Sequence, residues 1–294
     1  MNRIDKILIL GGSGLLGSSL VPILKDKGHF IEIHGRTNAA KYNADISDSK
    51  EAFNLLESIN PAVIVNLISL TDVDHCETHP NEAFLANVHT VENITHWIKQ
   101  KKPHCHLVHI STDQVYDGTG THTEEQVTLN NYYAFSKYAG ELAAERVEST
   151  ILRTNFFGYS YCDKRASLTD WLFRSLSNSN SIQVFDDVVF NPLSMRTLSE
   201  MIELIIRKKP IGVFNLGAHG GMSKGDFAFA FAEELKFLTN TMTRTSTDKV
   251  SFIKTYRPKN MHMDCSKFEN LLSVKLPFLK NEIKRVAKEY YEEA

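Results

Sequence analysis

The chain has 294 residues, of which 42% are hydrophobic and 23% charged, and this composition is typical of a globular protein. Its length suggests two domains. Lys and Arg number 33 against 35 Asp and Glu, a net charge of −2 that argues against a nucleic-acid partner. The four scattered cysteines form no disulfide framework or zinc motif, and no apolar run approaches the roughly 18 residues of a membrane span. We therefore expect a cytoplasmic protein with no membrane partner.

In the first half of the chain, short apolar runs alternate with longer amphipathic stretches. This rhythm is typical of parallel strands joined by crossover helices. We predict strands at residues 6–10, 30–34, 62–68, 106–111 and 151–156. We predict helices at residues 15–27, 49–59, 80–99 and about 132–148. The predicted fold class is α/β, with a doubly wound parallel Rossmann-type sheet.

The second half has a weaker rhythm and predicts a smaller α/β lobe. Strands are expected at 182–185 and 212–216, and helices at 168–176, 197–206, 224–238 and 278–291. We predict a dinucleotide-binding domain at 1–156 and mainly a substrate lobe at 157–294, with parts of 190–220 packing back on the first domain. The default place for a ligand is the cleft between two such lobes.

A glycine-rich turn joins the first predicted strand to the first helix. It reads Gly11-Gly-Ser-Gly14-Leu-Leu-Gly17. Glycines in this position permit a tight turn, let the backbone approach a phosphate, and allow the helix to pack closely on the strand. The helix N-terminus then faces the pyrophosphate of a dinucleotide. The alternative is a glycine turn with a purely structural role.

The residues that follow the second predicted strand, Gly35 and Arg36, indicate which cofactor the protein prefers. A site for NAD usually carries Asp or Glu there, which bonds the ribose 2′-hydroxyl. This chain has Arg36, whose guanidinium suits a 2′-phosphate, so NADPH is favoured with NAD as the second choice. A solvated surface arginine is the alternative. Asp45 and Ile46 are candidates to bond adenine, although an aspartate that caps a loop would look the same.

Tyr133 and Lys137 are four residues apart and so share one face of a predicted helix. A nearby ammonium stabilises a phenolate and brings the pKa of a tyrosine toward the working range of an acid catalyst. Thr112 follows the predicted strand 106–111, at the strand end where ligands bind in such sheets. The three residues suit the transfer of a proton to a carbonyl oxygen as a hydride arrives.

Longer strings surround these motifs. They are Val65-Asn-Leu-Ile-Ser-Leu-Thr71-Asp-Val-Asp-His-Cys-Glu77, Ile110-Ser-Thr-Asp-Gln-Val-Tyr-Asp-Gly118, Lys137-Tyr-Ala-Gly-Glu141 and Arg257-Pro-Lys-Asn260. With them, nearly the whole chain resembles the extended short-chain dehydrogenases/reductases, specifically the dTDP-4-dehydrorhamnose reductase family. The resemblance implies NADPH-dependent reduction of the C4 ketone of a nucleotide-linked 4-keto-6-deoxyhexose. It places the protein in deoxysugar biosynthesis for cell-surface polysaccharide, and it is compatible with a homodimer.

The resemblance also implies roles for individual residues. Thr112, Tyr133 and Lys137 form the catalytic set, with Tyr133 as proton donor and Lys137 also bonding the nicotinamide ribose. The residues implied in binding the cofactor pyrophosphate, adenine and ribose are Gly11, Ser13, Gly14, Leu15, Leu16, Gly17, Asp45, Ile46, Asn66, Ile68 and Ser69. The residues implied near the substrate are Thr71, Val73, Asn131, Phe156 and Arg257.

The chain departs from the family at the segment Arg153-Thr-Asn155-Phe156-Phe157-Gly158, where rhamnose-pathway enzymes have Arg-Thr-Ser-Trp-Val-Tyr. The identity of the sugar is therefore open, and a UDP- or GDP-linked ketosugar is an alternative to the dTDP-linked one.

Three alternative interpretations of the sequence have less support from its residues. A non-catalytic NADP-binding regulator, resembling the β subunit of methionine adenosyltransferase, would not need the complete Tyr–Lys–Thr set. A nucleotide-sugar epimerase or a dehydratase would need further acid–base groups, and Thr112 is followed by Asp113-Gln114 rather than Asp-Glu. Asp72, Asp74 and Glu77 resemble a metal site, but hard cations usually draw more oxygen ligands from one compact loop. We expect no metal.

Overall fold

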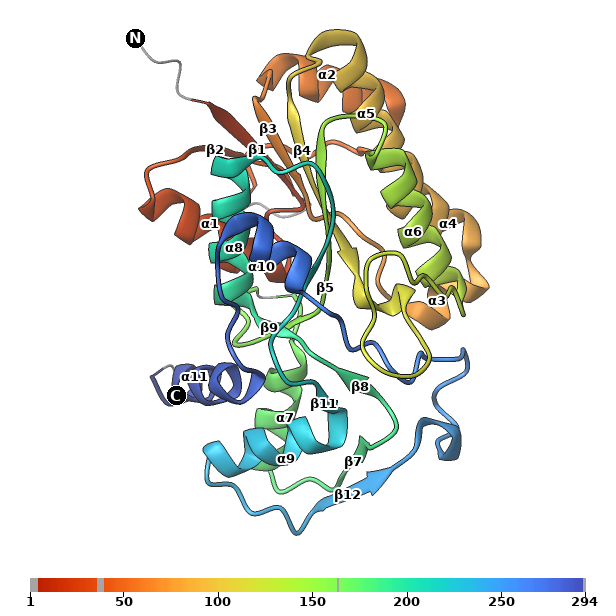
Figure 1. The fold of residues 1–294 in the computed structure, drawn as a ribbon, viewed down its shortest axis with the longest axis vertical. Helices are drawn as coiled ribbons and strands as arrows, with labels where there is room; N and C mark the ends of the chain where they lie inside the picture. The colour runs from red at the N-terminus through yellow and green to blue at the C-terminus, as the bar shows by residue number, and fades with distance from the viewer. Residues whose placement is uncertain (1–4, 36–39, 163, 293–294) are drawn as a thin grey trace. The chain divides into compact units, whose positions relative to one another are not determined.

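The computed structural model describes residues 5–35, 40–162 and 164–292. It confirms the predicted α/β class: a six-stranded sheet runs in the order β10-β5-β4-β3-β1-β2 (Figure 1). Its strands are β1 (Lys6–Leu10), β2 (Phe30–Ile33), β3 (Val63–Asn66), β4 (His106–Thr112), β5 (Ser149–Thr154) and β10 (Gly212–Leu216). The pairs β1–β2, β1–β3 and β3–β4 are parallel. Every residue of β3, β4 and β5 is buried, as expected for strands between two helical layers.

Helices cover both faces of this sheet, because each crossover between parallel strands carries one. They are α1 (Leu15–Asp26), α2 (Ser49–Ile59), α3 (Val73–Thr78), α4 (Pro80–Phe84), the π turn η1 (Leu85–His89), α5 (Thr90–Lys101), α6 (Tyr132–Ala144) and α8 (Met195–Lys208). Figure 1 shows α1 and α8 on one side of the sheet and α2, α5 and α6 on the other. This is the doubly wound arrangement that the alternating pattern predicts.

Packing divides the chain into two compact units, each made of three segments. The first unit contains Met1–Thr112, Asn131–Arg153 and Ser199–Val213. The second contains Asp113–Asn130, Thr154–Leu198 and Phe214–Ala294. Chain segments therefore pass repeatedly from one unit to the other.

The second unit contains short strands and helices. Its strands pair two by two as β6 (Phe156–Phe157) with β9 (Leu193–Ser194), β8 (Val189–Phe190) with β11 (Met222–Ser223), and β7 (Ile182–Phe185) with β12 (Met242–Thr245). Its helical elements are η2 (Asp113–Val115), α7 (Leu168–Ser177), α9 (Lys224–Glu234), η3 (Thr247–Lys249), α10 (Ser266–Leu272) and α11 (Leu279–Glu292).

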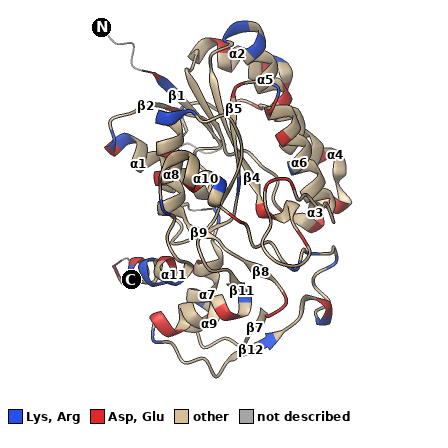
Figure 2. Ribbon diagram, viewed as in Figure 1, with Lys and Arg blue, Asp and Glu red and all other residues tan. Residues whose placement is uncertain are grey.

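The terminal helix α11 is amphipathic, as its sequence spacing predicts. Figure 2 shows Lys and Arg interspersed with Asp and Glu along it. Ile283, Val286, Ala287 and Tyr290 are buried and recur at helical spacing. Within the described ranges, no helix has the combination of length and hydropathy that crossing a membrane requires.

Two predicted helix ends are wrong by several residues. Helix α6 ends at Ala144 rather than at 148, because the Ser149 hydroxyl donates to the Ala144 carbonyl (2.9 Å) and β5 begins there. Helix α9 ends at Glu234 rather than at 238, and Lys236 adopts a φ of 58°. A left-handed residue just beyond a helix reverses the chain and stops it.

The predicted helix 80–99 is interrupted by the π turn η1. At its end, the backbone N–H of Thr90 donates to the Leu85 carbonyl five residues earlier, and the Thr90 hydroxyl donates to the same carbonyl (3.1 Å). Such single π turns inside α-helices occur frequently at functional sites. A five-residue turn leaves the apolar spacing nearly unchanged, so sequence periodicity does not reveal it.

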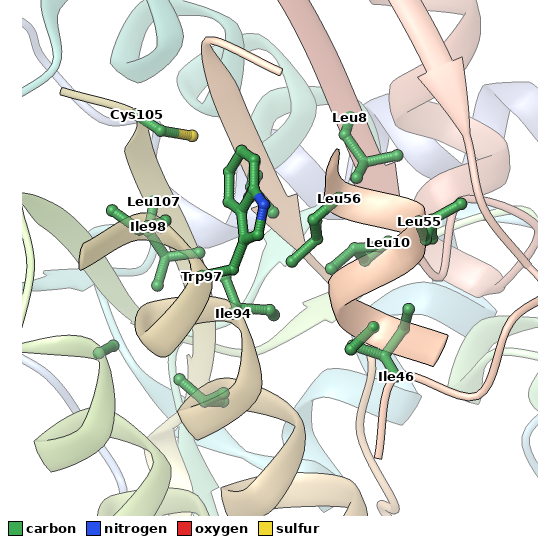
Figure 3. Close-up of a cluster of buried hydrophobic side chains, with 14 of the residues drawn as sticks. Leu8, Leu10, Ile46, Leu55, Leu56, Ile94, Trp97, Ile98, Cys105 and Leu107 are labelled. Carbon is green, nitrogen blue, oxygen red and sulfur yellow. The ribbon is translucent and has the colours of Figure 1, made fainter. Parts of the chain in front are cut away.

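The core of the first unit is a hydrophobic cluster contributed by β1, α2, α5 and β4. Figure 3 shows Trp97 among Leu56, Ile94 and Leu107. Its side chain is 1% exposed, and its indole N–H donates to a Glu57 carboxylate oxygen (3.1 Å). The polar end of this large side chain is therefore paired, and its apolar body fills the interior.

We expect Trp97→Ala to lower the free energy of unfolding by about 3–5 kcal/mol, because the surrounding core cannot fill the cavity. The matched control is Trp171→Ala, whose side chain is 44% exposed and should change stability by less than about 1 kcal/mol. Urea unfolding followed by circular dichroism measures both variants. Equal losses in the two variants would contradict this account of the core.

Candidate active site

The glycine turn between β1 and α1 has the conformation that its glycines permit. Gly11 has a φ of 77°, and the Gly14 N–H donates to the Gly11 carbonyl (3.0 Å). A Cβ on Gly17 would lie 2.5 Å from the carbonyl carbon of Gly12, so α1 packs directly on the turn. Leu15 begins the helix, Leu16 is buried, and the first turn carries no acidic side chain. Its amides and helix dipole therefore suit a phosphate.

The chain leaving β2 passes close to this turn. A Cβ on Gly35 would lie 2.9 Å from the Cβ of Ser13. Arg36 comes next and lies outside the described residues. Its pairing with a 2′-phosphate stays a prediction.

Asp45 caps the loop that precedes α2. Its carboxylate accepts the Ser47 N–H (2.9 Å) and the Ser47 hydroxyl (2.7 Å). These bonds from Ser47 lower the pKa of Asp45. Ile46 is 2% exposed and belongs to the core of Figure 3. Asp45 thus has a structural role in the loop, and its predicted bond to adenine stays a prediction.

Asn66 ends β3 in a fully buried position. Its side-chain oxygen accepts the Ile68 N–H (3.1 Å), so its amide nitrogen is the donor to Nδ1 of His109 (3.2 Å). His109 must then carry its proton on Nε2. Burial lowers the pKa of His109 well below its ordinary value, so the imidazole is neutral. A bonded chain of polar groups therefore links the loop after β3 to β4.

Helix α6 brings Tyr133 and Lys137 to one face, as their spacing predicts. Asn131 begins it as N-cap: its side-chain oxygen accepts the Ala134 N–H (2.8 Å). Lys137 is 2% exposed, and its ammonium donates to the Ile110 carbonyl (2.7 Å). Burial lowers the pKa of Lys137 to about 8, against the opposing effect of Glu141. The ammonium is therefore largely charged at neutral pH.

The neighbours of this pair include two other predicted site residues. Thr112 is the last residue of β4, two positions beyond the carbonyl that Lys137 bonds. Val73 belongs to the same buried cluster as Tyr133. Thr71 lies in the exposed stretch just before α3. The first unit thus holds Tyr133 beside Val73, and Lys137 at the strand end that carries Thr112.

Sequence reasoning missed Asn87, which lies in the π turn and hydrogen-bonds both the loop after β3 and helix α6. Its side-chain oxygen accepts the Ser69 hydroxyl (3.0 Å) and the Leu70 N–H (2.8 Å). Its amide nitrogen donates to the Ser136 hydroxyl on α6 (2.9 Å). A Cβ on Gly140 would overlap the Asn87 carbonyl oxygen, so the turn and α6 are in close contact. The signal in the sequence that could have identified it is an asparagine among the apolar residues of the predicted helix 80–99.

The carboxylates considered as a metal site serve the local structure instead. Asp72 is the N-cap of α3 and accepts the His75 N–H (3.0 Å). Glu77 accepts the Tyr132 N–H at the start of α6 (2.9 Å). Over the described ranges, no group of three or more His, Cys, Asp or Glu side chains is placed to hold a metal ion.

In the second unit, Asp117 anchors the segment that contains Arg257. Its carboxylate accepts the Tyr256 hydroxyl (2.8 Å) and the Lys259 N–H (3.0 Å), on either side of Arg257. Two strings that are distant in the sequence are therefore joined by one side chain. Phe156, in the strand β6, is only partly buried.

Sequence reasoning also missed Lys224, the first residue of α9. Burial lowers the pKa of Lys224, and Asp113 and Arg257 lie near enough to act on it with opposite signs. Asp113 accepts a hydrogen bond from the Asn155 side chain (2.7 Å). A lysine that begins a helix resembles a solvated residue in sequence, so no signal pointed to it.

A parallel sheet, a glycine turn that opens α1, and a buried Tyr133–Lys137 pair beside a strand end define an extended short-chain dehydrogenase/reductase. The model of the family described as the RmlD substrate binding domain matches residues 5–292. The chain belongs to this family, and the predicted resemblance is confirmed.

Individual proteins are similar over nearly the full length. The dTDP-4-dehydrorhamnose reductase of Shigella flexneri is 26% identical, over 97% of this chain and 98% of its own. The crystal structure of dTDP-4-dehydrorhamnose reductase from Bacillus anthracis in complex with NADP has a TM-score of 0.87 at 22% identity, covering 98% of this chain and 100% of its own. Methionine adenosyltransferase 2 subunit beta of Rattus norvegicus is 26% identical, over 93% of this chain and 84% of its own.

We expect Gly17→Ala to weaken NADPH binding, because the added methyl group would force α1 away from the glycine turn. Overpacking of about 1–3 kcal/mol corresponds to about 5- to 150-fold in Kd. The matched control is Ser18→Ala, which removes only a hydroxyl that bonds the Leu15 carbonyl within α1. Calorimetric titration with NADPH gives the Kd of both variants. Equal Kd values for Gly17→Ala and Ser18→Ala would show that the turn does not contact the cofactor.

Proposed function

We propose that this chain is an NADPH-dependent reductase that converts the C4 ketone of a nucleotide-linked 4-keto-6-deoxyhexose to an alcohol, in deoxysugar biosynthesis. The observation that carries the proposal is the buried, charged Lys137 one helical turn from Tyr133. This pair suits proton donation, and the chain belongs to the RmlD substrate binding domain family and is similar to dTDP-4-dehydrorhamnose reductases.

NADPH, when bound, supplies the hydride that reaches the ketone carbon. Thr112 donates a hydrogen bond to the ketone oxygen and holds it. Tyr133 donates its phenolic proton to that oxygen as negative charge develops there. The ammonium of Lys137 stabilises the phenolate that remains, and it acts strongly because the site is buried.

The cofactor assignment rests on the first unit. The left-handed Gly11 and the contact of Gly17 with Gly12 form a turn that a dinucleotide pyrophosphate can approach closely. The similar Bacillus anthracis reductase was crystallised with NADP. Arg36 is proposed to bond the 2′-phosphate, which favours NADPH over NADH.

The residues proposed to bind the sugar nucleotide are Thr71, Val73, Asn131, Phe156 and Arg257. Arg257 lies in a segment that Asp117 anchors through Tyr256 and Lys259, and a guanidinium suits a phosphate. Asn155 and Phe156 differ from the rhamnose-pathway pattern, so UDP- and GDP-linked sugars belong in the substrate panel beside dTDP-linked ones. A cytoplasmic location and a homodimer stay predictions.

The regulatory reading is less favoured, although the rat β subunit is among the relatives. A regulator needs the nucleotide fold but has no use for a buried ammonium beside a tyrosine. A stoichiometric enzyme partner together with no reductase activity would favour it. An epimerase needs acid–base groups beyond those proposed for reduction.

We expect the protein to consume NADPH with one member of a panel of dTDP-, UDP- and GDP-linked 4-keto-6-deoxyhexoses, measured by absorbance at about 340 nm. Tyr133→Phe should lower kcat by about 100- to 10,000-fold, because it removes the proton donor. NADPH affinity of that variant should be unchanged. Full activity of Tyr133→Phe would remove the assigned role, and binding of NADPH without turnover of any sugar would favour the regulator.

For the cofactor, Arg36→Ala should weaken NADPH binding by about 10-fold or more, because a charge-assisted hydrogen bond is lost. NADH lacks the 2′-phosphate, so its affinity should change much less. Titration of each cofactor into the variant and the unchanged protein gives the four Kd values. Equal weakening of both cofactors would assign Arg36 a structural role.

A further inference from the structure

A buried polar network centred on Glu141 lies in the first unit, next to the residues proposed for catalysis. Glu141 is on α6, one turn after Lys137, and is 1% exposed. Its carboxylate accepts the Ser111 hydroxyl from β4. It also accepts the Arg153 guanidinium from β5, with Nη2 to Oε2 at 2.7 Å and Nε to Oε1 at 3.1 Å. One side chain thus joins two neighbouring strands to the helix that covers them.

This network connects directly to the residues proposed for catalysis. Three consecutive residues of β4 are involved: the Ile110 carbonyl bonds Lys137, the Ser111 hydroxyl bonds Glu141, and Thr112 follows. Two side chains on successive turns of α6 therefore hold the end of the strand. A change in the second of these bonds would move Thr112 relative to Lys137.

The network also determines the charge around Lys137. The titratable groups facing it are Tyr133 and Glu141 from α6, His109 from β4 and Arg153 from β5. His109 is neutral, and Arg153 is a cation paired to Glu141. Glu141 is therefore the carboxylate of this set, and it opposes the effect of burial on the pKa of Lys137. Without it, Arg153 would lose its carboxylate partner while remaining buried.

We propose that Glu141 is a positioning residue of the reduction, which holds Lys137 in its charged form and, through Ser111, fixes the strand end that carries Thr112. The proposal rests on the proposed reductase activity for its effect on rate. Its effect on Lys137 itself is independent of any substrate.

The charge is tested with Glu141→Gln, which keeps the size of the side chain and removes its charge. Loss of a nearby anion lowers the pKa of Lys137, which therefore loses its proton at lower pH. In the unchanged protein, the rate of reduction should fall as the pH rises through about 8, where Lys137 deprotonates. In the variant this fall should begin about 1 pH unit lower.

A direct titration of Lys137 provides a second readout. The protein is labelled with ¹³C-lysine, and the resonance of Lys137 is assigned by its loss in Lys137→Met. We expect its titration midpoint to fall in Glu141→Gln. Glu203→Gln is the matched control, because Glu203 is a buried glutamate of α8 that pairs with Arg207 (2.7 Å). That control should leave the midpoint of Lys137 unchanged.

The strand contact is tested with Ser111→Ala, which removes the hydroxyl and leaves every charge in place. We expect kcat to fall by about 10-fold or more through misplacement of Thr112, with an unchanged pH profile. The matched control is Ser149→Ala, which removes a buried hydroxyl that ties β5 to the end of α6. It should cost similar stability and leave kcat within about twofold.

An unchanged Lys137 midpoint in Glu141→Gln would overturn the electrostatic part of the proposal, and equal kcat losses in the two serine variants would overturn the positioning part. If Glu141→Gln does not fold, Glu141→Gln with Arg153→Met removes both charges of the pair. Such replacements are often tolerated, and the midpoint should still fall. If no ketosugar is reduced by the unchanged protein, the proposed function fails, while the titration of Lys137 still decides the role of Glu141.

Discussion

The buried ammonium of Lys137 is the constraint on which the proposed catalytic part of the first unit depends. Removal of a charge from water costs several kcal/mol unless hydrogen bonds and an opposite charge compensate. The Ile110 carbonyl supplies a hydrogen bond, and Glu141 supplies the opposite charge. Burial has a benefit as well as a cost, because a charge acts more strongly on a neighbour such as Tyr133 when little water lies between them.

Burial of this lysine requires α6 to approach the sheet closely. Gly140 makes the approach possible, because any larger residue would overlap the Asn87 carbonyl oxygen. The π turn that contains Asn87 presents its backbone to α6 and its side-chain amide to Ser136 and Leu70. The same turn therefore packs against α6 and bonds the loop after β3. A substitution in the π turn or in α6 that alters their packing would therefore also shift the loop after β3.

Local patterns predicted much of the first unit. The strand β1, the helix α2 and the strand β10 have the bounds that their apolar spacing predicts, because each is short and flanked by clear turn residues. The helix end at Ala144 was missed, since it depends on a hydroxyl of the next strand. The short helices α3 and α10 were missed too, because six or seven residues are too few to show a helical period.

The side-chain network of the site is harder to derive from sequence. Tyr133 and Lys137 could be paired because helical spacing fixes their separation. The bonds between Asn66 and His109, and between Asp117 and Tyr256, join residues 43 and 139 positions apart. No local sequence rule connects such distant positions. A motif can therefore identify candidate site residues without identifying their hydrogen-bond partners. Asn87 and Lys224 lacked even a motif, and their partners came only from the fold.

The course of the chain between the two units separates the residues proposed for catalysis from Asn155. Thr112 ends one segment of the first unit, and Asp113 begins a segment of the second. Arg153 and Thr154 divide in the same way along β5. Asn155, where the chain departs from the rhamnose-pathway pattern, bonds Asp113 within the second unit. Substitutions just beyond β5 can therefore alter the surroundings of Asp113 while the Arg153–Glu141 pair, and the charge of Lys137 that depends on it, stay in place.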